Sequence, residues 1–186
     1  MNAMERIGAA IAGEKSDRRP FTLTLSLYGA RLSGTGCQAY YSDPRLYAAG
    51  QKAVVDLCEP DALFGPFAFA MEAAAFGAPV EQPADGPPTV RKPAYAASVD
   101  RTTVRRPDTE TSRQLRYLVD SVQAVVEDQR GTRPVAAPIV APTDLPALLI
   151  GMEAWIEILL FDPESAAFWN RLALEHFEAL AAAYFK

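Results

Sequence analysis

The chain has 186 residues, of which 49% are hydrophobic and 22% charged, and its formal charge is −5. This balance is typical of a soluble globular domain with its own core, and the acidic excess gives no reason to expect nucleic acid or an anionic membrane as a partner. The N-terminal segment lacks the apolar run of a signal peptide, and no stretch reaches the ~18 apolar residues of a membrane-spanning helix. We therefore expect a cytoplasmic protein of one domain, in which Cys37 and Cys58 remain thiols.

The first part of the chain predicts helices alternating with strands. Residues 21–28 alternate between apolar and polar side chains, which is the period of a strand, and the polar row would line the inside of a barrel. A second strand at 62–69 is apolar and is limited by Pro66, which favours an opening into a loop. In chain order we expect a helix at 4–12, the first strand, a glycine-containing loop at 29–41, a helix at 42–58 capped by Ser42, the second strand and one helical turn at 71–76.

The second part begins with an irregular, proline-rich excursion at 78–107, for which we expect one hairpin. A loop this long inside a compact domain is often functional. The clearest amphipathic helix follows at 108–128, with Gly131 just past its end. A third strand is predicted at 133–140, and helices are predicted at 142–152, 153–160 and 165–186.

Strands that alternate with helices favour parallel βαβ units. We therefore predict an α/β fold, a partial (β/α)8 TIM barrel with about three parallel βα units and an N-terminal helix. Residues 1–186 would form a single N-terminal portion of such a barrel, with 78–107 as its excursion.

Three segments at 4–21, 40–80 and 140–164 together resemble the uroporphyrinogen decarboxylase superfamily. They contain the phrases MERIGAAIAGEKSDRRPF, SDPRLYAAGQKAVVDLCEPDALFGPFAFAMEAAAFG and VAPTDLPALLIGMEAWIEILLFDPE, in the family's order and spacing. The family barrel is longer than this chain, so the resemblance implies its amino-terminal half. One branch of the family decarboxylates uroporphyrinogen without a cofactor, and the other moves methyl groups between corrinoid proteins and thiols with the help of zinc.

The resemblance to the decarboxylase branch is incomplete at the residues that carry its chemistry. That branch has two arginines after the first strand, which bind substrate carboxylates through the guanidinium fork. In this sequence the second is matched by Arg31, but the first is replaced by Leu27. The family's aspartate falls near Gly65–Phe67, where there is no acid, and its tyrosine falls near Leu148 or Leu149. Decarboxylation is therefore in doubt, and Arg31 is either a ligand for an anionic group or a solvated loop arginine.

The methyltransferase branch holds zinc through histidine and cysteine in the second half of its barrel. This chain offers His176, Cys37 and Cys58 without a close pairing, and we expect His176 at a helix surface or half-buried. We therefore expect no metal and no cofactor bound by this chain alone, although the resemblance implies zinc and a corrinoid partner for a full-length member. The segment 149–155 resembles this branch more closely.

Other candidate site residues follow the predicted strands. Phe64 and Phe67, with Phe69, would either floor an apolar ligand pocket or pack in the core. Glu72 would face the barrel mouth or be a solvated acid, and Asp144 would cap a helix or contact substrate. A basic run between Arg91 and Arg116 would attract a carboxylated tetrapyrrole or corrinoid, or form a solvated face.

The favoured interpretation is a protein of the corrinoid (methylcobamide):thiol methyltransferase-like branch, incomplete and inactive as this chain alone. The first alternative is a divergent uroporphyrinogen decarboxylase of tetrapyrrole biosynthesis. The second is a non-catalytic half-barrel that self-associates or binds a partner, because an open three-stranded sheet exposes unpaired edges. The substrate would be a tetrapyrrole or a corrinoid-bound methyl group, and a homo-oligomer or a missing C-terminal half would complete the fold.

Overall fold

The computed structural model describes every residue of the chain, 1–186, and divides it into two compact units, each built from separate stretches of sequence. Unit 1 consists of Met1–Phe67, Ala84–Pro87 and Tyr117–Pro138. Unit 2 consists of Ala68–Pro83, Pro88–Arg116 and Ile139–Lys186.

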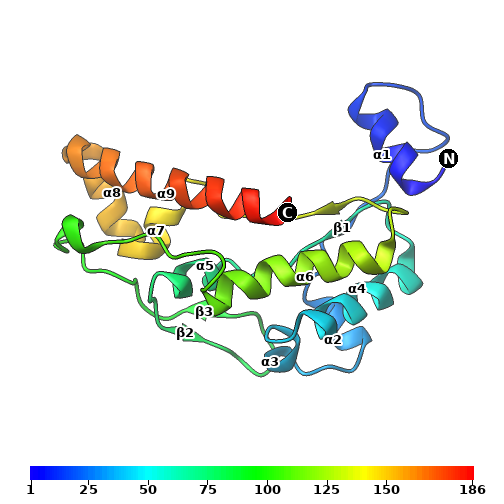
Figure 1. Ribbon diagram of the computed structural model, residues 1–186, viewed down its shortest axis with the longest axis horizontal. Coiled ribbons are helices and arrows are strands. Elements are labelled where there is room, and N and C mark those ends of the chain that lie inside the picture. Colours follow the sequence, from blue (N-terminus) through cyan, green and yellow to red (C-terminus); the bar gives the residue numbers. More distant parts are fainter. The chain divides into compact units, whose positions relative to one another are not determined.

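Unit 1 contains a small parallel sheet with helices. Thr22 forms a parallel bridge to Ala62, and β1 (Leu63–Phe64) pairs in parallel with β4 (Val135–Ala136). Three strand segments therefore lie side by side in chain order, as the predicted partial barrel requires. The helices of this unit, drawn in Figure 1, are α1 (Ala3–Ile11), α2 (Tyr28–Leu32), α3 (Cys37–Tyr40), α4 (Pro44–Cys58) and residues 117–129 of α6 (Arg113–Gln129).

The strands are much shorter than the alternating pattern predicts. They shrink to one bridge residue and two strands of two residues each. Pro66 follows β1, and Pro134 and Pro138 border β4, so the backbone there lacks N–H donors for a longer ladder. The apolar row of the first segment is only partly covered, since Phe21 is 40% and Leu23 is 39% exposed.

The predicted loop at 29–41 is wrong, because this segment forms the two short helices α2 and α3. The glycines that suggested a loop include one that permits close helix packing. A Cβ atom on Gly29 would lie 2.9 Å from the carbonyl carbon of Gly50, and one on Gly50 would lie 2.8 Å from the carbonyl oxygen of Gly29. Helix α2 therefore rests backbone to backbone on α4, a contact that periodicity alone does not reveal.

This crossing predicts that Gly50→Ala destabilises the protein. The added methyl group meets backbone atoms, which cannot rotate away, so we expect a loss of about 1–3 kcal/mol in the free energy of unfolding, measured by urea denaturation. Gly8→Ala in α1 is the matched control, because a Cβ atom there meets nothing within 4 Å. Alanine favours a helix interior over glycine, so Gly8→Ala should be neutral or stabilising by up to about 1 kcal/mol. Equal stability of the two variants would contradict the close approach.

A charge cluster ties α1 to the starts of the first two strand segments. The carboxylate of Asp61, 1% exposed, accepts hydrogen bonds from Arg6 at 2.5 Å, Arg18 at 2.6 Å and the Phe21 amide at 2.7 Å. Burial alone would raise the pKa of the Asp61 carboxyl group, but these donors outweigh burial and the pKa lies below its usual value. Hydrogen bonds from Arg6, opposed by partial desolvation, likewise lower the pKa of Asp17. The N-terminal ends of barrel strands typically serve stability, and this cluster fits that role.

Several helix starts differ from the sequence prediction: α7 begins at Leu145 rather than at 142, α9 begins at Pro163 rather than at 165, and two other starts have a local cause. Asp43, not Ser42, is the N-cap of α4, and its carboxylate accepts a hydrogen bond from the Arg45 amide at 2.9 Å. Helix α6 starts at Arg113 rather than at 108, because Asp108 instead bonds the amides of the two residues at 110 and 111 in a preceding turn.

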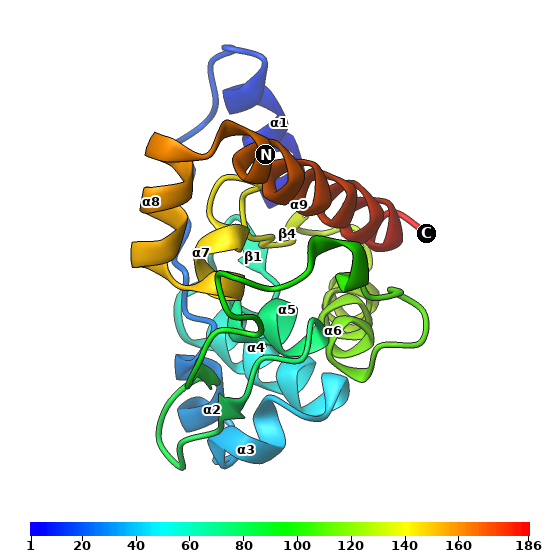
Figure 2. The same cartoon turned by 90° about the vertical axis from the view of Figure 1, so that its left-hand side faces the viewer.

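Unit 2 is mainly helical and includes the expected hairpin of the proline-rich excursion. The hairpin pairs Val80 with Val90 and Glu81 with Thr89 in antiparallel register. Helices α7, α8 and α9 pack against one another (Figure 2), and no helix of the chain combines the length and hydropathy needed to cross a bilayer. The elements are α5 (Ala70–Ala75), β2 (Val80–Glu81), β3 (Thr89–Val90), a 3-10 helix (Arg101–Thr103), α7 (Leu145–Ile150), α8 (Met152–Phe161) and α9 (Pro163–Tyr184).

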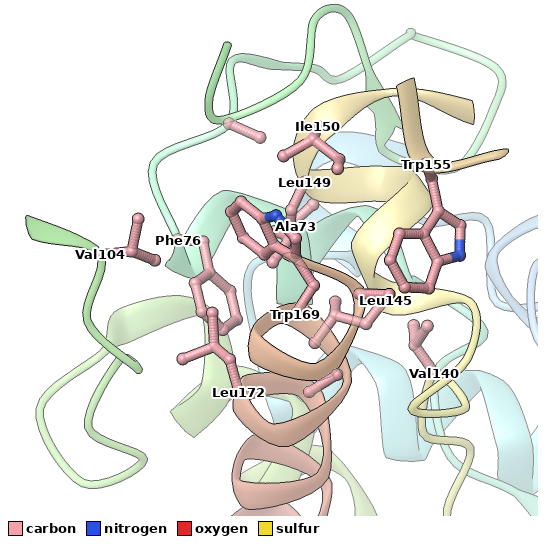
Figure 3. Close-up of a cluster of buried hydrophobic side chains, with 13 residues drawn as sticks. Ala73, Phe76, Val104, Val140, Leu145, Leu149, Ile150, Trp155, Trp169 and Leu172 are labelled. Carbon is pink, nitrogen blue, oxygen red and sulfur yellow. The ribbon is translucent and has the colours of Figure 1, made fainter. Parts of the chain in front are cut away.

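The core of unit 2 is an aromatic and aliphatic cluster, shown in Figure 3. Trp169 of α9 is 1% exposed, and Leu145 and Leu149 of α7 are fully buried. Burying one side chain of this size stabilises the fold by about 1.5–3 kcal/mol relative to leaving it exposed. Together these buried side chains hold the short helices in place. The remaining members are Ala73, Phe76, Ala78, Val104, Val140, Ile150, Trp155, Ala166, Leu172 and Ala173.

Candidate functional site

The first candidate site is a cavity of about 630 Å³ in unit 1, which we call the Arg31 pocket. It is formed by the segment after the first strand bridge, and active sites of α/β barrels are built from such strand-to-helix connections. Its lining is Thr24, Leu25, Leu27, Tyr28, Ala30, Arg31, Thr35, Gly36, Cys37, Ala84 and Asp85.

Arg31 is exposed and lies on α2 rather than on a loop. Its guanidinium carbon sits 5.9 Å from the centre of the Tyr28 ring, a cation–π contact that orients the side chain without neutralising its charge. Leu27, which stands where the decarboxylase branch has its other arginine, lines the same pocket. The pocket thus offers one guanidinium group and a largely apolar wall.

Ser26 fixes the backbone between Leu25 and Leu27, two residues that line the Arg31 pocket. Its hydroxyl group donates a hydrogen bond to the Tyr47 hydroxyl oxygen at 3.1 Å and accepts one from the Phe67 amide at 3.2 Å, while its carbonyl oxygen accepts one from Tyr40 at 2.9 Å. Burial raises the pKa of the Tyr47 and Tyr40 hydroxyl groups, so both remain neutral donors. The polar row of the first segment therefore includes a buried structural hub.

Phe64 and Phe67 pack against each other, with ring centres 5.7 Å apart and both side chains half-buried. Phe64 belongs to β1, and its carbonyl oxygen accepts a hydrogen bond from Tyr47. This arrangement agrees with packing in unit 1. Phe69, in contrast, lies in unit 2 and is 41% exposed.

The second candidate site is an apolar groove of about 610 Å³ in unit 2, which we call the α8 groove. Two of its segments, at Phe69 and at 139–144, follow β1 and β4 along the chain, where barrel enzymes place ligand-binding residues. Its lining is Phe69, Ile139, Val140, Ala141, Thr143, Asp144, Ala147, Leu148, Met152, Trp155, Ile156 and Leu159.

Asp144 supplies the charged group of the α8 groove. It stands at the N-cap position of α7, but its side chain makes no capping hydrogen bond. Its carboxylate accepts only a long bond of 3.3 Å from the Thr143 hydroxyl group. Asp144 therefore occupies the predicted N-cap position without the hydrogen bond of a cap, and its exposed carboxylate remains available to a ligand.

Glu72 is neither solvated nor at a mouth, contrary to both sequence interpretations. It is 1% exposed on α5, and its carboxylate accepts a hydrogen bond from the Val140 amide at 2.9 Å. The other carboxylate oxygen lies 3.0 Å from Nε2 of His176, which is fully buried, so the expectation of a surface or half-buried histidine is also wrong. Phe76 covers the imidazole edge with ring centres 5.1 Å apart. This pair joins α5, the segment after β4 and α9 inside unit 2.

The donor groups in this chain do not fit a zinc site. His176 is already engaged with Glu72 in the core, and Cys37 and Cys58 are separate free thiols. No group of three or more His, Cys, Asp or Glu side chains is arranged to hold a metal ion. A zinc ion needs at least three such protein ligands.

Sequence reasoning missed several residues of these two pockets. Cys37 and Tyr28 line the Arg31 pocket, while Trp155 and Met152 line the α8 groove. The spacing of Met152, Ile156 and Leu159 on one helix face was a readable signal, but a core face has the same spacing.

The basic run at 91–116 is partly paired, since Arg91 contacts Glu81 at 3.2 Å and Arg101 contacts Glu164 at 3.3 Å.

The parallel strand order, the helices between the strands and the pockets beyond them define part of an α/β barrel. The family model for uroporphyrinogen decarboxylase (URO-D) matches residues 2–186, so the chain belongs to this family. A methyltransferase from Methanosarcina mazei is similar in structure, with a TM-score of 0.82 at 16% identity over 98% of this chain. The chain spans 56% of the length of that methyltransferase. Among curated proteins, none matches the chain significantly.

Proposed function

We propose that this chain is the amino-terminal part of a methyltransferase-like member of the URO-D family, which transfers a methyl group between a corrinoid and a thiol. The observation that carries the proposal is Leu27 in the Arg31 pocket. A substrate with several carboxylate arms requires several cationic partners, and this pocket contains one arginine and one opposing acid, Asp85. The fold likeness to a methyltransferase supports the same branch.

In this proposal the chain's own residues bind and orient rather than react. Arg31 binds an anionic substituent of the substrate through its planar guanidinium group, and the Tyr28 ring keeps that group in place. The donor groups described above do not fit zinc, so the zinc ligands that the proposed reaction requires would come from other polypeptide.

The proposal is tested by two assays on the same preparation. The chain, and the complete gene product if the reading frame extends past Lys186, is incubated anaerobically with methylcobalamin and a panel of thiols. Loss of the methylcobalamin absorption spectrum reports transfer. Decarboxylation of uroporphyrinogen is followed in parallel by chromatography of the carboxylated products. We expect thiol-dependent loss of methylcobalamin from the complete product and no decarboxylation. Decarboxylation would instead establish the divergent decarboxylase.

A non-catalytic half-barrel is the second candidate, and the exposed apolar side chains Phe21 and Leu23 favour it. Light scattering after gel filtration separates the two candidates when both assays are silent. A monodisperse dimer of an inactive product supports the half-barrel and refutes methyl transfer.

A further inference from the structure

Helix α8 carries an unusual concentration of exposed apolar side chains. Ile156 is 49%, Leu159 is 50% and Leu160 is 68% exposed, and Met152 and Phe161 at the helix ends are 63% and 78% exposed. Met152, Ile156 and Leu159 follow a spacing of four and three residues, so they form one ridge along the helix, and the same three side chains border the α8 groove. Large contiguous apolar surfaces on a folded protein mark interaction sites.

The segment of the chain that carries this ridge has charges of one sign only. The stretch 134–170 contains five acidic residues and no Lys, Arg or His, so it carries the whole formal charge of −5 while the rest of the chain is balanced. Asp144 borders the α8 groove itself, and Glu153 and Glu157 are exposed on α8 next to the ridge. Both structural features, an apolar ridge and an acidic rim, belong to a single helix and its groove.

We propose that the α8 groove is a docking site for a protein segment that presents an apolar helix face bordered by Lys or Arg. The rim decides between the possible occupants. A second copy docking through its own α8 would bring Glu153 and Glu157 against their own equivalents, and like charges across an interface cost several kcal/mol. An anionic membrane surface is repelled for the same reason. A basic amphipathic helix satisfies the ridge and the rim together, as helix-in-groove recognition requires. This inference holds whichever reaction the family member performs.

Two synthetic amphipathic peptides with the same leucine face, one bordered by lysines and the other by glutamates, test the proposal on the full chain. Trp155 lines the groove and is 4% exposed, so a change in its emission reports binding, and Trp155→Phe identifies its share of the signal. We expect the lysine peptide to bind at least about tenfold more tightly than the glutamate peptide, with a preference that shrinks in high salt and in the Glu153→Gln/Glu157→Gln variant.

The double variant Ile156→Ser/Leu159→Ser should abolish binding and still fold, because both side chains are half exposed. Leu174→Ser on α9 is the matched control, since Leu174 is 46% exposed but does not line the groove, and it should bind as the wild type does. Equal affinity for the two peptides, no binding, or binding that survives the double serine variant would overturn the proposal. So would a dimer that the double variant dissociates, or capture on neutral phosphatidylcholine vesicles in preference to the lysine peptide.

Discussion

Replacing Glu72 by alanine should lower the free energy of unfolding by about 2–6 kcal/mol, because it leaves two buried hydrogen-bonding groups unpaired at about 1–3 kcal/mol each. The variant leaves the Val140 amide and His176 Nε2 without their partner in the interior of unit 2. Nδ1 of His176 already lacks a hydrogen-bond partner, so the imidazole would lose its remaining bond. Urea denaturation followed by far-ultraviolet circular dichroism measures the loss.

Two further variants make this result specific to the buried pair. Glu72→Gln keeps an oxygen acceptor of the same shape and should cost clearly less than Glu72→Ala. Glu178→Ala, on the exposed face of α9, should change stability by no more than about 0.5 kcal/mol. If Glu72→Ala behaves like Glu178→Ala, then the buried pair does not join α5 and α9 as described.

Replacing Asp61 by alanine should lower the free energy of unfolding by about 3 kcal/mol, at the lower end of the range for a buried pair because Arg18 is half exposed. Two arginines and the Phe21 amide lose their acceptor together. The same denaturation experiment measures the loss, and Asp56→Ala, on the exposed face of α4, is the control that should stay near the wild type. A neutral Asp61→Ala would show that the cluster does not hold the starts of the strands.

The Asp61 cluster also sets the direction of the pH dependence. Because the folded pKa of Asp61 lies below its usual value, its contribution to stability is complete above about pH 4 and is lost as the pH falls through the folded value. The wild type should therefore lose stability on acidification, and Asp61→Asn, which has no carboxyl group there, should lose it less steeply. Parallel acid profiles of the two proteins would contradict this account.

The parallel strand order and the family were accessible from the sequence. The helix at 44–58, the amphipathic stretch of α6 and the prolines around the strands are local signals, each encoded within a few residues. The family resemblance rests on the order of three such segments, and the match over residues 2–186 confirms it.

The candidate site was less accessible. The glycine at 29 has the same local meaning in a loop and in a helix crossing, and only contact with Gly50 separates the two. Glu72 and His176 lie 104 residues apart, so no local pattern announces their hydrogen bond. The apolar face of α8 has the spacing of a core helix, although Ile156 is 49% exposed.

The sequence by itself determined the order of the elements, the parallel arrangement of the strands and the family, because periodicity, turn residues and motif spacing are properties of neighbouring residues. Only the tertiary structure decided the length of the strands, the burial of Glu72 with His176 and the exposure of the α8 ridge. These features depend on which distant segments of the chain come into contact. Such contacts decide whether a buried polar group has a hydrogen-bond partner and whether an apolar side chain remains exposed to water.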